Sequence, residues 1–334
     1  VSTATAEWKV PPDAMMTRWG KQVTPQNAWQ EYPRPQFRRE QNWKNLNGLW
    51  QYGINKSDRI PQLYDGDILV PFPVESALSG VRRLLAPDET LWYRKRLSHQ
   101  TPEGHRTHLH FEAVDYACTV YLNGTEVGSH TGSSDPFKFD ITEALRPGDN
   151  ELVVRVVDAT APSQTLGKQS LKPKGIYYTR VSGIWQTVWL EDVPNRHFRM
   201  VKMKPRIAEG TLRVLPTLQG VALERERIRI TVRDGDRIVG TADSALSVRI
   251  PDAKLWSPKQ PHLYGITMEL FDGETLIDRV ESYAAMREVG VKRGPAGQIR
   301  MTLNGKVIFH YGPLDQGWWP DGLFLFFRPI PPLG

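Results

Sequence analysis

Apolar and polar residues alternate with a period of two along much of the chain, a pattern typical of strands that bury one face. In the stretch HLHF, Leu109 and Phe111 alternate with His108 and His110. Residues 150–160 repeat the pattern after a Pro-Gly-Asp turn. No long run with the helical period interrupts these stretches in residues 1–200. The pattern therefore predicts an all-β protein.

Short turn signals separate the alternating stretches. Asn-Gly and Asp-Gly pairs between two such stretches favour two-residue hairpin turns, because both residues tolerate a positive φ. These pairs occur at Asn123-Gly124, Asp234-Gly235, Asp272-Gly273 and Asn304-Gly305. We therefore expect a β-hairpin at each of them.

The hairpins group into separate units along the chain. A first β unit ends at the Pro194-Asn195 break, and the next holds several short strands in about 90 residues, the size of an immunoglobulin-like sandwich. We predict a sandwich domain over 1–194 that includes an N-terminal extension, a second sandwich over 195–286, and a third piece over 287–334.

Composition and charge narrow the classes of function. The chain of 334 residues is 40% hydrophobic and 24% charged, and its net charge of +6 is 43 basic minus 37 acidic residues. Basic residues are interleaved with acidic ones, as in LERERIRI, so no nucleic-acid partner is predicted. No apolar run reaches the roughly 18 residues of a membrane span, so no membrane partner is predicted either.

Candidate metal and nucleophile residues are sparse. The single cysteine, Cys118, falls on the apolar side of a predicted strand, which indicates a buried, inert thiol. His108 and His110 share one strand face at a spacing that suits two metal ligands, but no third ligand follows in the sequence. An exposed strand face is the favoured interpretation. No phosphate loop or serine nucleophile elbow is present. We predict no metal site and no cofactor.

Several segments, in order, resemble glycoside hydrolase family 2, the β-galactosidase and β-glucuronidase group. They are YPRPQFRREQNWKNLNGLWQYGI, ILVPFPVESALSGV, LWYRKRL, VYLNGTEVGSHTGSSDPFKFDIT, SGIWQTVWLE, LWSPKQPHLY with AMREVGVKR, and LNGKVIFHYG. The resemblance implies a jelly-roll (galactose-binding-like) sugar-binding domain, an immunoglobulin-like β-sandwich and the start of a (β/α)8 barrel.

The resemblance also implies a retaining β-glycosidase whose two catalytic glutamates lie on barrel strands. Such a barrel needs roughly 250 residues, far more than 287–334 supplies. We therefore expect a chain truncated before the catalytic barrel, with a carbohydrate-binding or scaffolding role. Two alternatives stay open, namely a stand-alone glycan-binding module and a truncated chain with its own glycosidase activity.

Two stretches are candidates for sugar binding. By resemblance, the loop before SGIWQ and the first barrel loop, GPLDQGWWPDG, reach towards a sugar. Their candidate residues are Tyr177, Tyr178, Arg180, Asp315, Gln316, Trp318 and Trp319. Weak candidates for a residual catalytic site are Asp135, Asp140 and Asp315. Retention needs two carboxyl groups about 5–5.5 Å apart, which the sequence cannot measure.

The C-terminal tail departs from the family's pattern. Residues 324–334 read FLFFRPIPPLG, which begins no helix. Together with Trp318 and Trp319, this tail is expected to expose apolar surface and to cause self-association through 312–334. Periplasmic or secreted localisation is expected only by analogy with the family.

Overall fold

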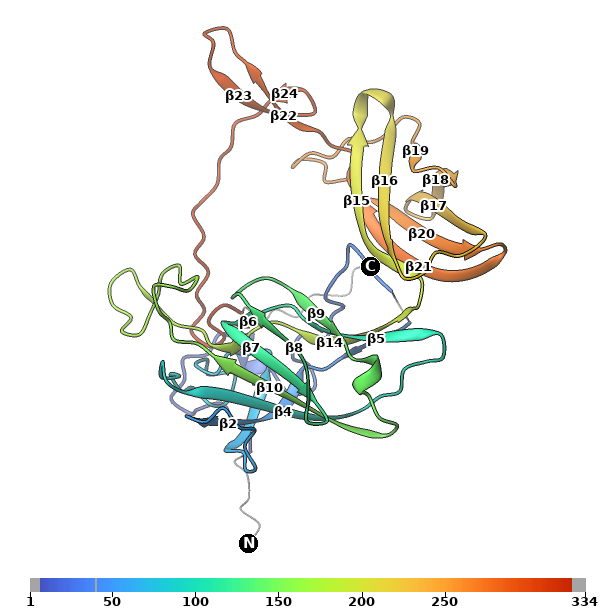
Figure 1. Ribbon diagram of the computed structural model, residues 1–334. Coiled ribbons are helices and arrows are strands. Elements are labelled where there is room, and N and C mark those ends of the chain that lie inside the picture. Colours follow the sequence, from blue (N-terminus) through green and yellow to red (C-terminus); the bar gives the residue numbers. More distant parts are fainter. Residues whose placement is uncertain (1–6, 40, 326–334) are drawn as a thin grey trace. The chain divides into compact units, whose positions relative to one another are not determined.

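The computed structural model of the chain describes residues 7–39 and 41–325, so most of the atypical tail, including Phe326 and Phe327, lies outside the described residues (Figure 1). Nearly all the regular secondary structure of the described residues is strand, which confirms the predicted all-β class. They contain three short 3-10 helices: η1 (Gly20–Gln22), η2 (Thr142–Ala144) and η3 (Ile207–Glu209). No helix among them is long and apolar enough to cross a membrane.

The chain divides into two compact units. Unit 1 comprises Val1–Pro33, Trp43–Asp192 and Gln316–Gly334, and unit 2 comprises Arg34–Asn42 and Val193–Asp315. Each unit is therefore assembled from segments that are far apart in the sequence.

Unit 1 is a sandwich of two antiparallel sheets. The larger sheet has the order β3 (Gly66–Val70), β2 (Gly48–Asn55), β4 (Thr90–Ser98), β10 (Asp149–Val157), β7 (Ala117–Leu122), β8 (Thr125–Thr131). The smaller has the order β1 (Trp43–Asn45), β14 (Val188–Pro194), β5 (His105–Phe111), β9 (Phe137–Asp140). Leu109 and Phe111 of β5 join Trp50, Tyr93 and Val154 of the larger sheet in one buried core.

Two short pairings organise the loops at one end of unit 1. β6 (Val114–Asp115) pairs with β13 (Gly183–Ile184), and β11 (Gln169–Ser170) pairs in parallel with β12 (Tyr178–Thr179). The second pairing ties the loop between β10 and β13 to itself, so that its aromatic and polar side chains are held in place.

Unit 2 contains two sheets around a second core, and a third small sheet. The order in the first sheet is β15 (His197–Arg206), β16 (Thr211–Gln219), β19 (Ser247–Arg249). The second has the order β18 (Arg237–Asp243), β17 (Glu226–Asp234), β20 (Tyr264–Asp272), β21 (Thr275–Ala284). The third consists of β22 (Val289–Arg293), β23 (Ile299–Leu303) and β24 (Lys306–Val307).

The predicted hairpins are confirmed. At Asn123-Gly124 both residues have positive φ, 53° and 81°, and the turn joins β7 to β8. At Asn304-Gly305 the values are 51° and 74°, and the turn joins β23 to β24. These pairs of positive φ angles are what a type I′ turn requires.

Candidate carbohydrate site

The loop between β10 and β13 and the segment that starts at Gln316 meet at one end of unit 1. The indole of Trp318 stacks on the ring of Tyr178, with centroids 4.7 Å apart and planes 11° apart. The Tyr178 hydroxyl donates a hydrogen bond to Gln316 Oε1, and Lys168 Nζ donates another to the same oxygen at 2.9 Å. The structure thus brings together three of the predicted residues and adds Lys168, which sequence reasoning missed.

Trp318 is held on two sides but keeps an unsatisfied donor. Its indole also packs against Phe324, with centroids 4.3 Å apart. Its Nε1 is buried, yet no acceptor among the described residues bonds to it. A buried donor without an acceptor is rare in native structures. Tyr177, beside the stacked pair in the chain, is 53% exposed.

The other predicted sugar-binding residues lie elsewhere. Arg180 is buried, and its Nε lies 3.9 Å from Glu75 Oε1. Its charge therefore pairs with a carboxylate inside unit 1. Asp315 is exposed and belongs to unit 2. Trp319 is half-buried and forms a backbone bridge with Leu323. The structure therefore places none of these three in the stacked cluster.

Asp321 docks the C-terminal segment onto unit 1. Its buried carboxylate accepts hydrogen bonds from Thr17 N at 2.9 Å and Thr17 Oγ1 at 2.6 Å. Its carbonyl oxygen accepts a bond from Leu78 N at 3.0 Å. Leu323 and Leu325 are buried in a cluster of the same unit. Trp318 and Phe324 pack partly buried against this cluster, so these two side chains are not fully exposed as expected.

Three carboxyl groups are buried beneath the loop. Glu75, Asp115 and Asp158 are each at most 5% exposed. Ser182 N donates to Glu75 Oε2 at 2.9 Å, and Ser182 Oγ donates to Asp158 Oδ2 at 2.7 Å. Gln169 Nε2 donates to Asp115 Oδ2 at 3.4 Å. The cluster links β6, the loop and β13, and sequence reasoning did not find it.

Burial dominates the electrostatics of this cluster. Burial raises the pKa of Glu75 to about 7, against the opposing effects of the Ser182 hydrogen bonds and the Arg180 charge. Burial also raises the pKa of Asp115 to about 8, and the nearby charges of Asp158 and Glu75 raise it further. Near neutral pH the cluster thus keeps protons that exposed carboxyl groups would lose.

The weak catalytic candidates are not arranged as a glycosidase pair. Asp140 forms an ion pair with Arg106, and its carboxylate accepts a hydrogen bond from Thr142 Oγ1 at 2.6 Å. Burial would raise the pKa of Asp140, but these hydrogen bonds lower it below its ordinary value. Asp135 is exposed in the bend before β9. Asp140 therefore lacks the raised pKa that a general acid needs at neutral pH.

The two histidines of β5 are buried, so the prediction of an exposed strand face is wrong. His108 and His110 are 2% and 5% exposed, and His110 Nε2 lies 3.1 Å from Glu191 Oε2. His110 also stacks on Trp189, with centroids 4.0 Å apart. Another layer of side chains therefore covers the face of β5 that turns away from the core.

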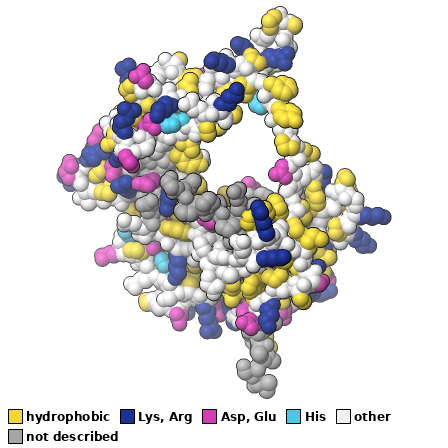
Figure 2. Space-filling view, turned by 180° about the vertical axis from the view of Figure 1, so that it is seen from behind, with side chains coloured by type: hydrophobic (Ala, Val, Ile, Leu, Met, Phe, Trp, Pro, Cys, Tyr) yellow, Lys and Arg dark blue, Asp and Glu magenta, His cyan; other side chains and the backbone are white. Residues whose placement is uncertain are grey.

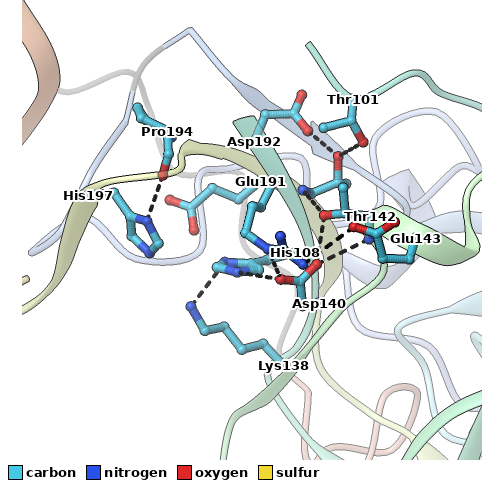
Figure 3. A network of polar contacts seen from close by, with 12 residues as sticks. Thr101, His108, Lys138, Asp140, Thr142, Glu143, Glu191, Asp192, Pro194 and His197 are labelled. Carbon is cyan, nitrogen blue, oxygen red and sulfur yellow. Dashed lines mark hydrogen bonds and ion pairs between the residues drawn. The ribbon is translucent and has the colours of Figure 1, made fainter. Parts of the chain in front are cut away.

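Glu191 joins the two histidines as a third potential metal ligand, which the sequence did not reveal. One potential ligand atom each from His108, His110 and Glu191 lies within 4.8 Å of the others. Lys138 Nζ, however, lies 3.0 Å from His108 Nδ1, and Figure 3 shows Lys138 and Asp140 both reaching the His108 ring. Burial and the Lys138 charge lower the pKa of His108 to about 3. The lysine charge opposes a second cation, so this group carries no metal proposal.

Comparisons with known proteins identify both sandwiches. Residues 62–194 match the family described as "Glycosyl hydrolases family 2, sugar binding domain", and residues 211–287 match "Glycosyl hydrolases family 2". The β-galactosidase of Leuconostoc mesenteroides is 26% identical to this chain over an alignment of 365 positions. The alignment covers 92% of this chain and 32% of that protein. The β-galactosidase of Thermoanaerobacter pseudethanolicus is 26% identical over 217 residues, which cover 59% of this chain and 28% of that protein.

A similar fold occurs in a solved β-glucuronidase from Ruminococcus gnavus. That structure superposes with a TM-score of 0.68 at 17% sequence identity, covering 84% of this chain and 51% of the other. At this identity the likeness shows the fold. The chain thus spans 32% or less of the two β-galactosidases and about half of this structural neighbour.

Proposed function

The chain belongs to glycoside hydrolase family 2, and on that premise we propose that it forms the carbohydrate-binding part of a β-glycosidase. The region that matches the sugar-binding domain, residues 62–194, holds most of the sandwich of unit 1. An end loop of this region carries Tyr178, on which Trp318 of the C-terminal segment stacks. We further propose the division into a sugar-binding domain over 1–194, an immunoglobulin-like sandwich over 195–286 and a barrel start over 287–334.

The Tyr178–Trp318 cluster is the observation that carries this proposal. Aromatic rings bind sugars by packing against C–H groups of the pyranose, while a few polar groups fix the orientation of the hydroxyls. Tyr178 is fixed by Trp318 and Gln316, so little side-chain entropy is lost on binding. Lys168, which is exposed, supplies a hydrogen-bond donor.

Binding, rather than bond cleavage, is the role that the described residues support. Among residues 7–39 and 41–325 there is no α-helix, whereas the family's catalytic barrel has eight. Glu75 and Asp115 have raised pKa values but are at most 5% exposed, so a substrate cannot reach them. We propose that the chain positions a β-linked glycoside for a catalytic barrel.

Isothermal titration with methyl β-galactoside, methyl β-glucuronide and their oligosaccharides tests the proposal. We expect saturable binding of at least one sugar, and a loss of about tenfold or more in Tyr178→Ala, because a buried aromatic contact is worth more than 1 kcal/mol. Tyr311→Ala is the matched control, since Tyr311 is 94% exposed and outside the cluster. Equal losses in both variants, or no binding of any sugar, would contradict the proposal.

We propose self-association through the β22–β24 sheet, a different surface from the predicted tail. Val291 and Met301 face each other across β22 and β23 and are 69% and 53% exposed. Phe309 and Tyr311 follow at 88% and 94%, and Figure 2 shows hydrophobic side chains along the segment after β24. Light scattering should show an oligomer that Val291→Glu with Met301→Glu abolishes. A monomer at all working concentrations would contradict this.

A further inference from the structure

The outer face of the three-stranded sheet in unit 2 is strongly basic. Strand alternation turns Met203, Leu212 and Val248 towards the core of the unit, and the residues between them turn outwards. The outward positions carry five exposed cations, Lys202, Lys204, Arg206, Arg213 and Arg249. We call these five residues the basic face.

The strand register brings the charges of the basic face close together. Lys204 lies directly opposite Arg213, and Thr211 lies between Arg206 and Arg249. Neighbouring strands are about 4.8 Å apart and alternate residues along a strand about 6.7 Å apart, both less than the Debye length of about 8 Å at physiological salt. The charges therefore act together, and like charges directly opposite each other destabilise the sheet.

No acidic side chain compensates the basic face. Among the described residues, no ion pair joins any of the five cations to a carboxylate. Glu209, the acidic residue between Arg206 and Arg213 in the chain, is exposed and accepts a hydrogen bond from Thr211 Oγ1 at 3.4 Å. On the other sheet, by contrast, Arg227 pairs with Asp243 at 2.6 Å. The repulsion within the basic face is thus left for an external anion to relieve.

We propose that the basic face binds an acidic polysaccharide through its carboxylate or sulfate groups. A small anion could reach only one or two of the cations, whereas a polymer that repeats its charge can contact several strands at once. The three strands expose no aromatic ring on which unpaired bases could stack, which disfavours a single-stranded nucleic acid. The choice of a polysaccharide rests on the proposed function, but the surface is separate from the Tyr178 cluster.

The sequence does not display the basic face directly. Along the chain, basic and acidic residues are interleaved, and on that pattern we predicted no nucleic-acid partner. In a strand only alternate residues share a face, and three strands that are distant in sequence contribute here. Cations from residues 202–206, 213 and 249 therefore gather although no basic run links them.

Fluorescence anisotropy with labelled polygalacturonate, heparin, neutral dextran and oligo-dT tests the proposal on the full chain. The diagnostic variant is Lys204→Glu with Arg213→Glu. Its control is Lys9→Glu with Lys21→Glu, because those two cations are exposed and lie in unit 1, outside the basic face and outside the β22–β24 sheet. Circular dichroism establishes that each variant is folded.

We expect polygalacturonate or heparin, but not dextran, to bind at low salt and to weaken steeply as salt rises. The two polyanions distinguish carboxylate from sulfate recognition. The diagnostic variant should lose about tenfold or more in affinity, and the control less than about twofold. Absence of polyanion binding, equal losses in both variants, or tighter binding of oligo-dT than of either polysaccharide would overturn the proposal. Titration with the neutral methyl β-galactoside reports on the first site separately, so failure of one proposal can be told from failure of the other.

Discussion

Replacing Asp115 by Asn should protect unit 1 against unfolding at alkaline pH. Asp115 is 3% exposed, and burial, together with the charges of Asp158 and Glu75, raises its pKa to about 8. In an unfolded chain an aspartate titrates near pH 4. Between about pH 4 and pH 8 the folded protein therefore holds a proton that the unfolded protein has already lost.

The sign and size of the effect follow from proton linkage. The folded state binds more protons than the unfolded state between about pH 4 and pH 8, so the free energy of unfolding falls as pH rises through this window. Each pH unit well inside the window costs about 1.4 kcal/mol. From pH 6 to pH 8 the free energy of unfolding falls by about 2 kcal/mol because of Asp115. The fall is smaller than the full slope would give, because the pH values close to 8 lie near the folded pKa of Asp115. Asn has no titrating proton and can still accept the Gln169 hydrogen bond.

Urea unfolding followed by tryptophan fluorescence measures this difference. Every tryptophan except Trp256 lies in unit 1, so the signal reports on the unit that holds Asp115. Between pH 6 and pH 8 the variant should lose about 2 kcal/mol less stability than the wild type. Asp149→Asn, at an exposed position of β10, is the control and should follow the wild type. Parallel curves for wild type and Asp115→Asn would refute the reasoning.

Further predictions concern the C-terminal segment, a glycine and catalysis. Asp321→Ala should cost about 2 kcal/mol in urea unfolding, because it leaves the half-buried Thr17 donors without an acceptor; an unchanged midpoint would contradict the docking. Gly183→Ala should cost about 3 kcal/mol or more, since φ is 87° and a Cβ would lie 2.1 Å from Tyr93 Oη. Gly124→Ala, at φ 81° with open space, should cost only about 1 kcal/mol by thermal unfolding. The purified chain should not hydrolyse nitrophenyl β-glycosides above a mock purification; turnover lowered by a point mutation in the chain would contradict this.

Local patterns were sufficient to predict the fold class and the hairpins. Alternation in β5 and β7 places Leu109, Phe111 and Cys118 in the core, as expected. Asn-Gly pairs define their turns through backbone angles alone, so no distant contact is needed to predict them. These features depend on neighbours along the chain, which a sequence displays directly.

Features that depend on distant segments were missed or mispredicted. His108 and His110 were expected on an exposed face, but Trp189 stacks on His110, and Tyr32 of the N-terminal extension packs against Trp189 with centroids 5.6 Å apart. The carboxyl cluster joins Glu75 to residues 115 and 158, and no local pattern marks it. In both cases, the histidines and the carboxyl cluster, segments that are distant in the sequence bury the side chains.

The indole spectrum of ¹⁵N-labelled protein tests the carbohydrate site most directly. Each of the 11 tryptophans gives one N–H signal, and Trp318→Phe identifies that of Trp318. Its indole stacks on Tyr178, so a sugar bound at this pair should shift this signal. The account predicts that methyl β-galactoside or methyl β-glucuronide moves the Trp318 signal saturably and leaves Trp256 of unit 2 in place. A Trp318 signal that stays fixed while either sugar binds would contradict the proposed site.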